Sequence, residues 1–267
     1  MSNADMGLKG PCYLPGYDTE QPTCVEGVRA LTAIHRRLRI PATFFLVGRL
    51  VEHNRDELRD LLTDPLFEIG SHSYSHCQFE GADPALVRDE LQRTQDLIGD
   101  VFGVTPRGFR APGGTVTGFR GDVERLGIFA EIGFEYVSSQ GWGPGKTMPA
   151  PVTAPYTYAE EGFSNLLEIP MHGWHENILT KVNPWQSPSQ PLGPDAPQTI
   201  EAWCAPFVAD MDTTLGQSLP YYGPTMHPWS LRRFDRDCRQ VEALLQIAQE
   251  RGFAFATFSE FRRQLLD

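Results

Sequence analysis

The feature that most constrains the fold of this chain is a repeated alternation of helical and strand patterns. Apolar residues recur at helical spacing over 23–38, and the β-branched and aromatic run 42–47 follows, apolar on both faces. Asp83 and Pro84 then have the pattern of a helix start, with an apolar stripe that continues to Phe102. A strand that is apolar on both faces and lies between helices is typical of an α/β fold with a parallel sheet.

The alternation continues to the C-terminus. Gly252 ends a helical pattern that contains Val241 and Ala248, and 253–257 reads as a final strand. Seven or eight strand–helix units can close into a barrel, so we expect an α/β fold with a single (β/α) barrel, complete or irregular, of seven to eight strands. A length of 267 residues suits one domain, expected to span 1–267. The remaining expected elements are strands over 66–70, 107–111, 134–138, 165–171 and 220–227, and a helix over 122–132.

Two stretches, 140–163 and 172–198, have no regular pattern and are expected to be long loops. Loops of this length in a compact domain usually form lids or binding walls, although disorder is the competing interpretation. Their aromatic residues favour substrate contact. The second stretch holds Trp174, Trp185, Pro184, Pro188, Pro191, Pro194 and Pro197.

Charge and composition exclude several partners. The 23 basic and 34 acidic residues give a net charge of −11, which repels nucleic acid and anionic membrane surfaces. Without an apolar run of 18 residues or a secretory leader pattern, the chain is expected to be cytoplasmic and not bound to a membrane. The segment 2–4, Ser-Asn-Ala, resembles an expression-tag remnant, so a native leader could have been removed. The five cysteines form no CxxC pair and are expected to be reduced structural thiols.

The most specific local pattern is Ser71-His72-Ser73-Tyr74-Ser75-His76, directly after an expected strand. On a helical turn, two histidines four residues apart face the same way and can bind one divalent ion such as zinc. The alternative is that the rings only form hydrogen bonds within a turn. By contrast, His35 and His53 are expected on helix surfaces and are assigned no function.

Three other expected strand ends carry groups that can do chemistry. Asp18 and Glu20 would lie on the same side of an extended segment, or form an exposed acidic turn. Arg110 leads into a Pro-Gly-Gly turn over 112–114, where backbone can approach a ligand closely. His227 ends another strand, either as a proton donor or as a structural hydrogen-bonding residue. Because catalytic groups of such barrels gather at the carboxyl ends of the strands, these segments are expected to meet.

In this chain order, the segments resemble the polysaccharide deacetylase superfamily, also called the NodB homology domain or carbohydrate esterase family four, from about Tyr17 to Phe258. The resemblance implies a NodB-like barrel and a metal-dependent hydrolase of carbon–nitrogen (amide) bonds. Its expected reaction is the N-deacetylation of an N-acetylated sugar or polysaccharide. It further implies that Asp18 is the general base and that His72 and His76 bind the metal.

The chain departs from the family pattern at two places. Thr19 stands where a second aspartate normally binds the metal, so Glu20 is expected to replace it as the third ligand of a divalent ion, zinc being the expected one. The segment 137–142, Val-Ser-Ser-Gln-Gly-Trp, has the tryptophan of the family's fourth motif but not its aspartate. The sequence therefore does not identify the partner that orients His227.

In the expected mechanism, Asp18 takes a proton from the attacking water, His227 protonates the departing nitrogen, and Arg110 keeps Asp18 charged and aimed. For His172 and His175, packing against Trp174 is an equal alternative to substrate contact. The residues expected to contact substrate are Pro112, Gly113, Trp142, His172, His175 and Trp229.

Two other functions remain open at this point. If Glu20 cannot reach the metal, the chain is expected to resemble allantoinases, which hydrolyse a small amide or cyclic imide and are described as working without metal. The other alternative is a catalytically silent protein that binds glycans through its tryptophans. An oligomer is compatible with the long loops, and the expected partner is an N-acetylated sugar or a small amide substrate.

Overall fold

The structure is a computed structural model that describes residues 10–180, 192 and 195–266. Pro184, Trp185, Pro188, Pro191 and Pro194 of the second expected loop lie outside the described residues.

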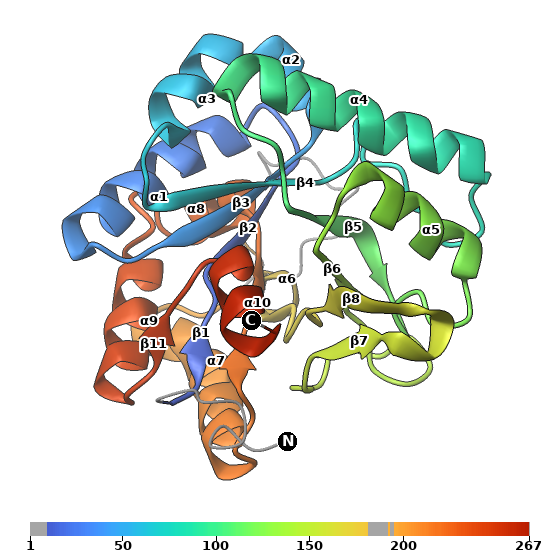
Figure 1. Ribbon diagram of the computed structural model, residues 1–267. Coiled ribbons are helices and arrows are strands. Elements are labelled where there is room, and N and C mark those ends of the chain that lie inside the picture. Colours follow the sequence, from blue (N-terminus) through green and yellow to red (C-terminus); the bar gives the residue numbers. More distant parts are fainter. Residues whose placement is uncertain (1–9, 181–191, 193–194, 267) are drawn as a thin grey trace.

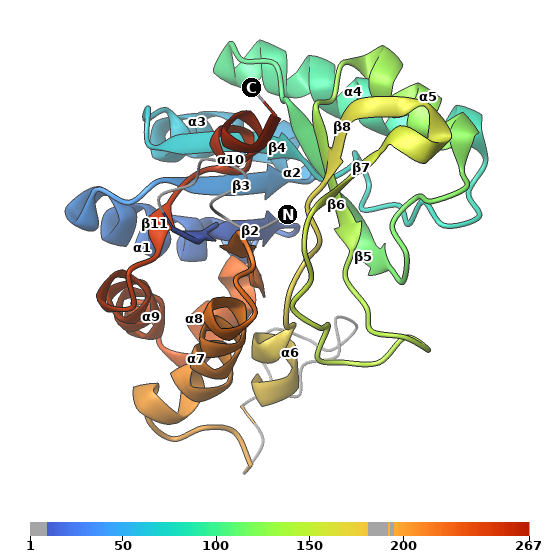
Figure 2. The same cartoon turned by 60° about the horizontal axis from the view of Figure 1, so that its bottom comes forward.

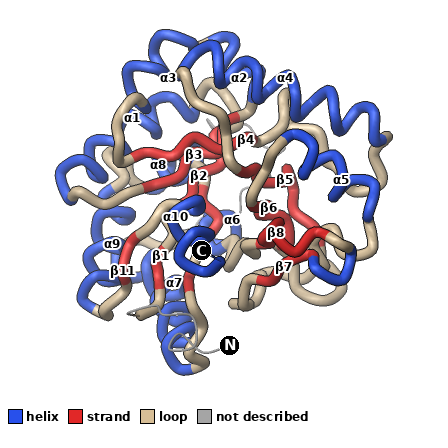
Figure 3. The backbone as a smooth tube through the Cα atoms, in the orientation of Figure 1, coloured by secondary structure: helices blue, strands red, loops and turns tan. Residues whose placement is uncertain are grey.

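Eight strands follow one another around a ring, in the order β10-β2-β3-β4-β5-β6-β8-β7 (Figure 3). All neighbours are parallel except β7, which pairs antiparallel with β8. The strands are β2 (Gly16–Thr19), β3 (Ala42–Leu46), β4 (Phe67–Ser71), β5 (Gly108–Thr115), β6 (Tyr136–Gln140), β7 (Tyr156–Tyr158), β8 (Phe163–Glu168) and β10 (Thr225–Met226).

A second, smaller sheet has three parallel strands in the order β11-β1-β9. These strands are β1 (Cys12–Tyr13), β9 (Tyr221–Tyr222) and β11 (Ala254–Phe255). The expected strand 220–227 is therefore two short strands, β9 and β10, which belong to different sheets. The two strands face different neighbours because Gly223 and Pro224 separate them.

Helices surround the strands (Figure 1), and the arrangement agrees with the expected α/β fold of irregular (β/α) barrel type. None of the described helices combines the length and hydrophobicity of a membrane span. The helices are α1 (Cys24–Leu38), α2 (Gly48–His53), α3 (Arg55–Leu62), α4 (Pro84–Phe102), α5 (Val123–Ile132), α6 (His175–Thr180), α7 (Ile200–Gly216), α8 (Pro228–Phe234), α9 (Arg239–Glu250) and α10 (Phe258–Leu266), with a 3-10 turn over Ala159–Glu161.

The apolar run that was expected to be buried on both faces is β3, and all five of its residues are buried. Phe44 faces outward into the cluster that contains Leu31 of α1. Phe45 faces into the ring, where it packs with Tyr136 and Phe258. The two faces of one strand thus contact different parts of the core, which explains the absence of polar alternation.

The ring is not closed by a continuous ladder. Its two sides meet at one parallel bridge between His172, just after β8, and Pro224, just before β10. The His172 amide donates to the Gly223 carbonyl at 3.0 Å, and the Thr225 amide donates to the His172 carbonyl at 3.1 Å. This bridge brings the carboxyl ends of β8 and β10 together, which matters for the candidate site.

Both expected loops contain regular structure. The stretch 140–163 includes β7 and the 3-10 turn, and the stretch 172–198 includes α6. Strand β5 also continues through the expected turn at 112–114, with a register shift between Arg110 and Thr115 and left-handed φ values at Gly113 and Gly114. The glycines allow the strand to bend without ending.

Candidate active site

The two ends of the ring differ in their chemistry. Helix α10 lies at the amino ends of the strands, where the Phe258 amide donates to Thr43 and Ser259 hydrogen-bonds to Glu68. Helix α6 follows β8 and lies at the carboxyl ends, apart from α10 (Figure 2). The carboxyl ends bring together the residues that sequence singled out for catalysis, which are Asp18, Glu20, His72, His76, Arg110 and His227.

Asp18 and Arg110 form a buried ion pair inside the ring. Arg110 Nη1 donates to Asp18 Oδ1 at 2.8 Å, and Arg110 Nε donates to Ser138 Oγ at 3.3 Å. The guanidinium lies over the rings of Phe45 and Phe258, at 4.2 and 5.0 Å from their centroids. Held by a charged hydrogen bond and by ring contacts, Arg110 fixes one oxygen of Asp18 and leaves the other free to face the site.

Glu20 lies among three imidazole rings. Its Oε1 is 3.0 Å from His76 Nε2, 3.4 Å from His227 Nε2 and 3.5 Å from His72 Nε2. Ligand atoms of Glu20, His72 and His76 all lie within 4.8 Å of one another, as do those of Asp18, Glu20 and His227. Glu20 belongs to both groups, so one carboxylate links a possible metal site to the acid–base pair.

Thr19 does not enter this cluster. Its hydroxyl donates to the Tyr17 carbonyl at 3.2 Å, and its side chain is buried. Because side chains alternate along β2, Asp18 and Glu20 lie on one side and Thr19 on the other. The shift of the second acidic residue by one position therefore keeps a carboxylate at the site.

The segment His72–His76 is a loop, although the spacing suggested a helical turn. Ser73 and His76 have left-handed φ values of 59° and 64°. Ser73 Oγ accepts the Cys77 amide at 3.0 Å, and Glu90 of α4 accepts both the amide and the hydroxyl of Ser75 at 2.7 Å. These bonds replace the helical ones, so side-chain contacts, not helix periodicity, bring the two histidines together.

The tautomer of His72 suits metal binding. Its Nδ1 lies 2.8 Å from the Arg110 carbonyl, which can only accept, so Nδ1 carries the proton. Its Nε2 is buried and has no hydrogen-bond partner among the described residues. A neutral imidazole with a free nitrogen beside a carboxylate and a second imidazole is a donor set that zinc and related ions accept.

His227 follows β10 and precedes α8, so its ring enters the site from the other side of Glu20. Its Nε2 lies 3.9 Å from Asp18 Oδ2, and its Nδ1 is hydrogen-bonded to Glu176 Oε1. Glu176 is a buried residue of α6 and was not singled out from the sequence. It is the partner of His227 that the sequence analysis did not identify.

Burial and neighbouring charges shift the pKa values of Glu20 and His227 in opposite directions. Burial alone would raise the pKa of Glu20, but the charge and hydrogen bond of His227, together with the hydrogen bond of His76, bring it well below 4.5. Burial alone would lower the pKa of His227, but Glu20 and Glu176 raise it well above 6.5. Burial raises the pKa of Glu176, opposed by His227. The result is a protonated His227 beside ionised Glu20, which is the state a proton donor requires.

Glu176 had a signal in the sequence. It lies in the cluster Pro-Met-His-Gly-Trp-His-Glu over 170–176, directly after an expected strand, where the carboxyl ends of barrel strands place functional groups. The two histidines of this cluster were predicted to contact substrate, and the carboxylate that ends the cluster was not.

His172 and His175 are engaged by protein groups. The His172 ring is fully buried, with Nδ1 accepting the Gly223 amide and Nε2 facing the Thr153 backbone, and burial lowers its pKa to about 4. His175 Nε2 lies 2.7 Å from Asp210 Oδ2 of α7. These contacts favour the structural alternative that the sequence left open for both histidines.

The other residues expected to contact substrate lie around the site. Trp142 is half-buried, stacks on Trp174 at 5.8 Å and donates from Nε1 to the Gly113 carbonyl at 2.7 Å. Pro112 and Trp229 are buried, with the Trp229 ring 6.2 Å from that of His227. Contact of these residues with substrate stays a prediction.

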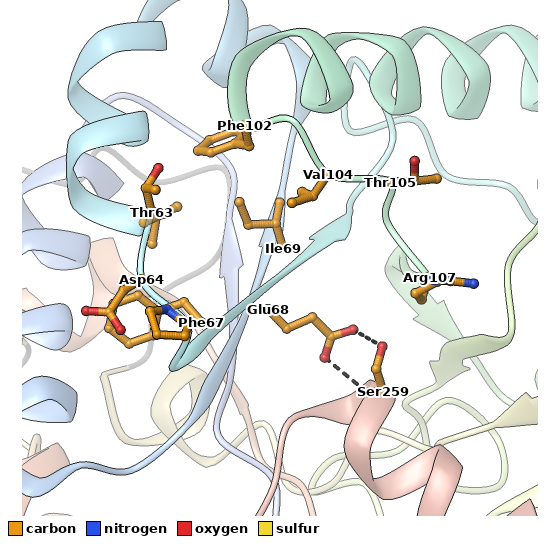
Figure 4. Close-up of a pocket in the computed structure, with 12 residues that line it drawn as sticks. Thr63, Asp64, Phe67, Glu68, Ile69, Phe102, Val104, Thr105, Arg107 and Ser259 are labelled. Carbon is orange, nitrogen blue, oxygen red and sulfur yellow. Dashed lines mark hydrogen bonds between the residues drawn. The ribbon is translucent and has the colours of Figure 1, made fainter. Parts of the chain in front are cut away.

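A cavity of about 400 Å³ lies at the opposite end of the ring, beside β4 (Figure 4). Its walls are mostly apolar. The carboxylate of Glu68 in this wall accepts hydrogen bonds from Thr43, Tyr136 and Ser259. Asp64 and Arg107, also in its wall, pair with Arg36 and Glu135. With its charged groups engaged, this cavity offers no chemistry comparable to that at the carboxyl ends.

Comparison with known proteins agrees with this geometry. Residues 16–136 match the family described as polysaccharide deacetylase. The chain is 30% identical over 106 residues to a chitooligosaccharide deacetylase of Bradyrhizobium sp. (39% of this chain, 47% of the relative). It is 29% identical over 86 residues to a peptidoglycan deacetylase of Helicobacter pylori (32% and 29%). In both cases the match spans less than half of the relative's length.

The fold extends the likeness beyond the matched segment. A solved structure from Mycobacterium smegmatis, assigned to the polysaccharide deacetylases, superposes with a TM-score of 0.71 at 20% identity and covers 96% of this chain and 90% of its own. The family match over 16–136 and the shared fold agree with the resemblance to the polysaccharide deacetylase superfamily that the order of the motifs indicates.

Proposed function

We propose that the protein is a metal-dependent hydrolase of amide bonds that removes the acetyl group from an N-acetylated sugar or polysaccharide. The observation that carries this proposal is the convergence of Glu20, His72 and His76 within 4.8 Å, next to the pair of Asp18 and Arg110 and to His227. A silent binding protein has no need of a base, its orienting arginine and a proton donor at one point.

Glu20, His72 and His76 would hold a divalent ion, for which zinc fits the nitrogen and oxygen donor set. When bound, such an ion polarises a carbonyl group and makes water more acidic. The free oxygen of Asp18 accepts the proton of the attacking water, while Arg110 holds the carboxylate in place. His227 Nε2 donates its proton to the departing amine.

An N-acetylated sugar is preferred as substrate because both relatives compared above are deacetylases by name, one of chitooligosaccharide and one of peptidoglycan. The exposed fractions of the proposed ligands indicate the side from which the substrate would approach. His76 is the most open of the three proposed ligands, with 36% of its side chain exposed against 16% for Glu20 and 1% for His72. Substrate would therefore approach over His76.

The test is elemental analysis of purified wild-type, Glu20→Ala and His72→Ala proteins, together with amine release from N-acetylated sugar oligomers and from small cyclic imides. His53→Ala is the matched control because His53 is exposed and, among the described residues, forms its hydrogen bond with the Arg49 carbonyl of its own helix. We expect about one equivalent of metal in the wild type and in His53→Ala, and its loss with activity in both site variants.

Two outcomes would redirect the proposal. Metal-free wild-type protein that hydrolyses imides would support the allantoinase-like alternative, in which Glu20 acts without an ion. Protein that binds metal and sugar oligomers but releases no amine would support the silent glycan-binding alternative.

A further inference from the structure

Two consecutive residues of helix α6, His175 and Glu176, form hydrogen bonds with two different partners. His175 Nε2 lies 2.7 Å from Asp210 Oδ2 on α7, and Glu176 accepts the hydrogen bond of His227 Nδ1 just before α8. Helix α6 packs against both of these helices. The proton donor of the proposed reaction is therefore connected, through consecutive residues of one helix, to a carboxylate on the outer helix α7.

We propose that Asp210 is a positioning residue for His227, acting through His175 and Glu176. This inference rests on the proposed function, because it treats His227 as the proton donor. Asp210 itself touches neither His227 nor the other proposed catalytic groups; its described side-chain partners are His175 and the Tyr222 hydroxyl, which donates at 3.3 Å.

The first argument is that α6 needs external support. A helix of six residues is far too short to be stable by its own hydrogen bonds. It also begins directly after Trp174, whose φ of 67° is strained for a bulky aromatic residue. The bond between His175 and Asp210 ties the first turn of α6, where Glu176 lies, to a helix of 17 residues.

The second argument concerns Glu176. Its side chain is fully buried, and its Oε2 has no hydrogen-bond partner among the described residues. A buried carboxylate with an unsatisfied oxygen gains from any movement that satisfies it, so its position must be imposed by the backbone that carries it. The backbone position of Glu176 is in turn set by the bond that its neighbour His175 makes with Asp210.

The third argument is the orientation of His227. With Nδ1 bonded to Glu176, the ring can present only Nε2 to Asp18 and Glu20. A small displacement of Glu176 would let the ring rotate and misdirect Nε2, and misplacement by about 1 Å can cost a hundredfold in rate. Asp210 would thus affect the rate of proton donation without contact with substrate.

The experiment compares Asp210→Ala with Asp212→Ala. Asp212 is the matched control because it lies on the same helix but pairs with Arg251 on an exposed face. On the substrate that the amine-release assay identifies, Asp210→Ala is expected to lower kcat about tenfold with KM unchanged. Asp212→Ala is expected to change neither. Asp210→Asn, which keeps an oxygen acceptor for His175, is expected to recover most of kcat.

A second measurement does not depend on activity. The imidazole ¹⁵N–¹H resonances of His227 are expected to change in Glu176→Ala and in Asp210→Ala, and to keep their wild-type positions in Asp212→Ala. Unchanged resonances and unchanged kcat in folded Asp210→Ala would overturn the inference. If the wild type hydrolyses none of the substrates, the proposed function fails, and the resonances alone still decide whether Asp210 positions His227.

Discussion

Arg110 and Asp18 form an ion pair that is buried on both sides, with Nη1 and Oδ1 2.8 Å apart. The guanidinium of Arg110 also lies over the rings of Phe45 and Phe258, and Gly16 of β2 approaches it closely. A Cβ at residue 16 would lie 3.1 Å from Arg110 Nη2. The strand that carries Asp18 is thus shaped around the arginine that orients Asp18.

Arg110→Lys should therefore be a severe change although the charge is kept. Lysine cannot reproduce the planar contact with two rings or the paired bonds to Asp18 and Ser138. We expect the free energy of unfolding to fall by about 2 kcal/mol and kcat to fall about a hundredfold. Denaturant unfolding and steady-state kinetics measure the two effects.

The control for this change is Arg107→Lys, just ahead of the same strand. Arg107 is exposed and pairs with Glu135, so both quantities should stay near their wild-type values. Equal effects at the two positions would show that the contacts of Arg110 inside the ring determine neither the free energy of unfolding nor kcat.

The charge of Glu20 should decide metal affinity. Glu20→Gln keeps the shape of the side chain and its reach to His76, but removes the anionic ligand. We expect metal affinity to fall at least about tenfold, measured by competition with a chelator. Glu80→Gln, an exposed residue paired with Lys146, should leave the affinity unchanged.

Glu90 should support the loop that carries the two histidines. Its two oxygens accept the amide and the hydroxyl of Ser75, next to His76, whose left-handed φ needs support from its surroundings. Glu90→Ala is expected to weaken metal binding by about tenfold or more, an effect of the size seen for residues that orient ligands. Asp89→Ala, at an exposed neighbouring position of α4, is the comparison, and an equal loss there would contradict this role.

Hydrophobic periodicity predicted most of the ring because burial on two faces leaves a clear pattern. Hydrophobic periodicity failed where a proline interrupts a helical pattern or where a helix is too short to show one. In α7, Trp203, Phe207 and Met211 are buried at helical spacing, but Pro206 within the helix hides it. Helices α2 and α3 follow each other after β3 with too few residues each to show a period.

Short motifs predicted most residues of the candidate site. They failed for a residue that contacts the site from a segment outside these motifs. Asp18, His72 and Arg110 come from segments whose order is recognisable. Glu176 could not be found in this way because the family pattern has its carboxylate in the segment 137–142, whereas Glu176 reaches His227 from α6. Such a contact depends on the meeting of β8 and β10 at the bridge of His172, which no local pattern encodes.

His35 should make stability depend on pH. The sequence placed it on a helix surface, which is wrong: its ring is fully buried, bonded to the Tyr17 hydroxyl at 2.8 Å and the Ile40 carbonyl at 2.9 Å. Burial lowers the pKa of His35 to about 4. The unfolded chain binds this proton at higher pH than the folded one, so stability present above about pH 6.5 is lost as the pH falls toward 4.

Each such histidine contributes a slope of about 1.4 kcal/mol per pH unit in this window. His172, with its pKa also lowered to about 4, adds a second contribution of the same sign. Denaturant unfolding between pH 4 and 6.5 should therefore show a shallower slope for His35→Gln than for the wild type. His53→Gln, at an exposed position, should keep the wild-type slope.

Gly27 of α1 should be required for stability and for kcat, because α8, which begins just after His227, packs directly on it. A Cβ at residue 27 would clash with the Pro228 carbonyl oxygen, a backbone atom that cannot rotate away. Alanine favours a helix over glycine by about 1 kcal/mol, but forced overpacking costs about 1–3 kcal/mol. Gly27→Ala is thus expected to lower the free energy of unfolding and, since Pro228 follows His227, to lower kcat as well.

Gly99→Ala provides the opposite case within a helix of the same fold. Its nearest neighbour would be the Val104 carbonyl oxygen at 3.9 Å, an ordinary contact, so the helix preference of alanine has nothing to oppose it. We expect this variant to gain up to about 1 kcal/mol of stability with unchanged kcat. If Gly27→Ala were equally stabilising and fully active, the packing of α1 against the residues after His227 could not be what places the proton donor.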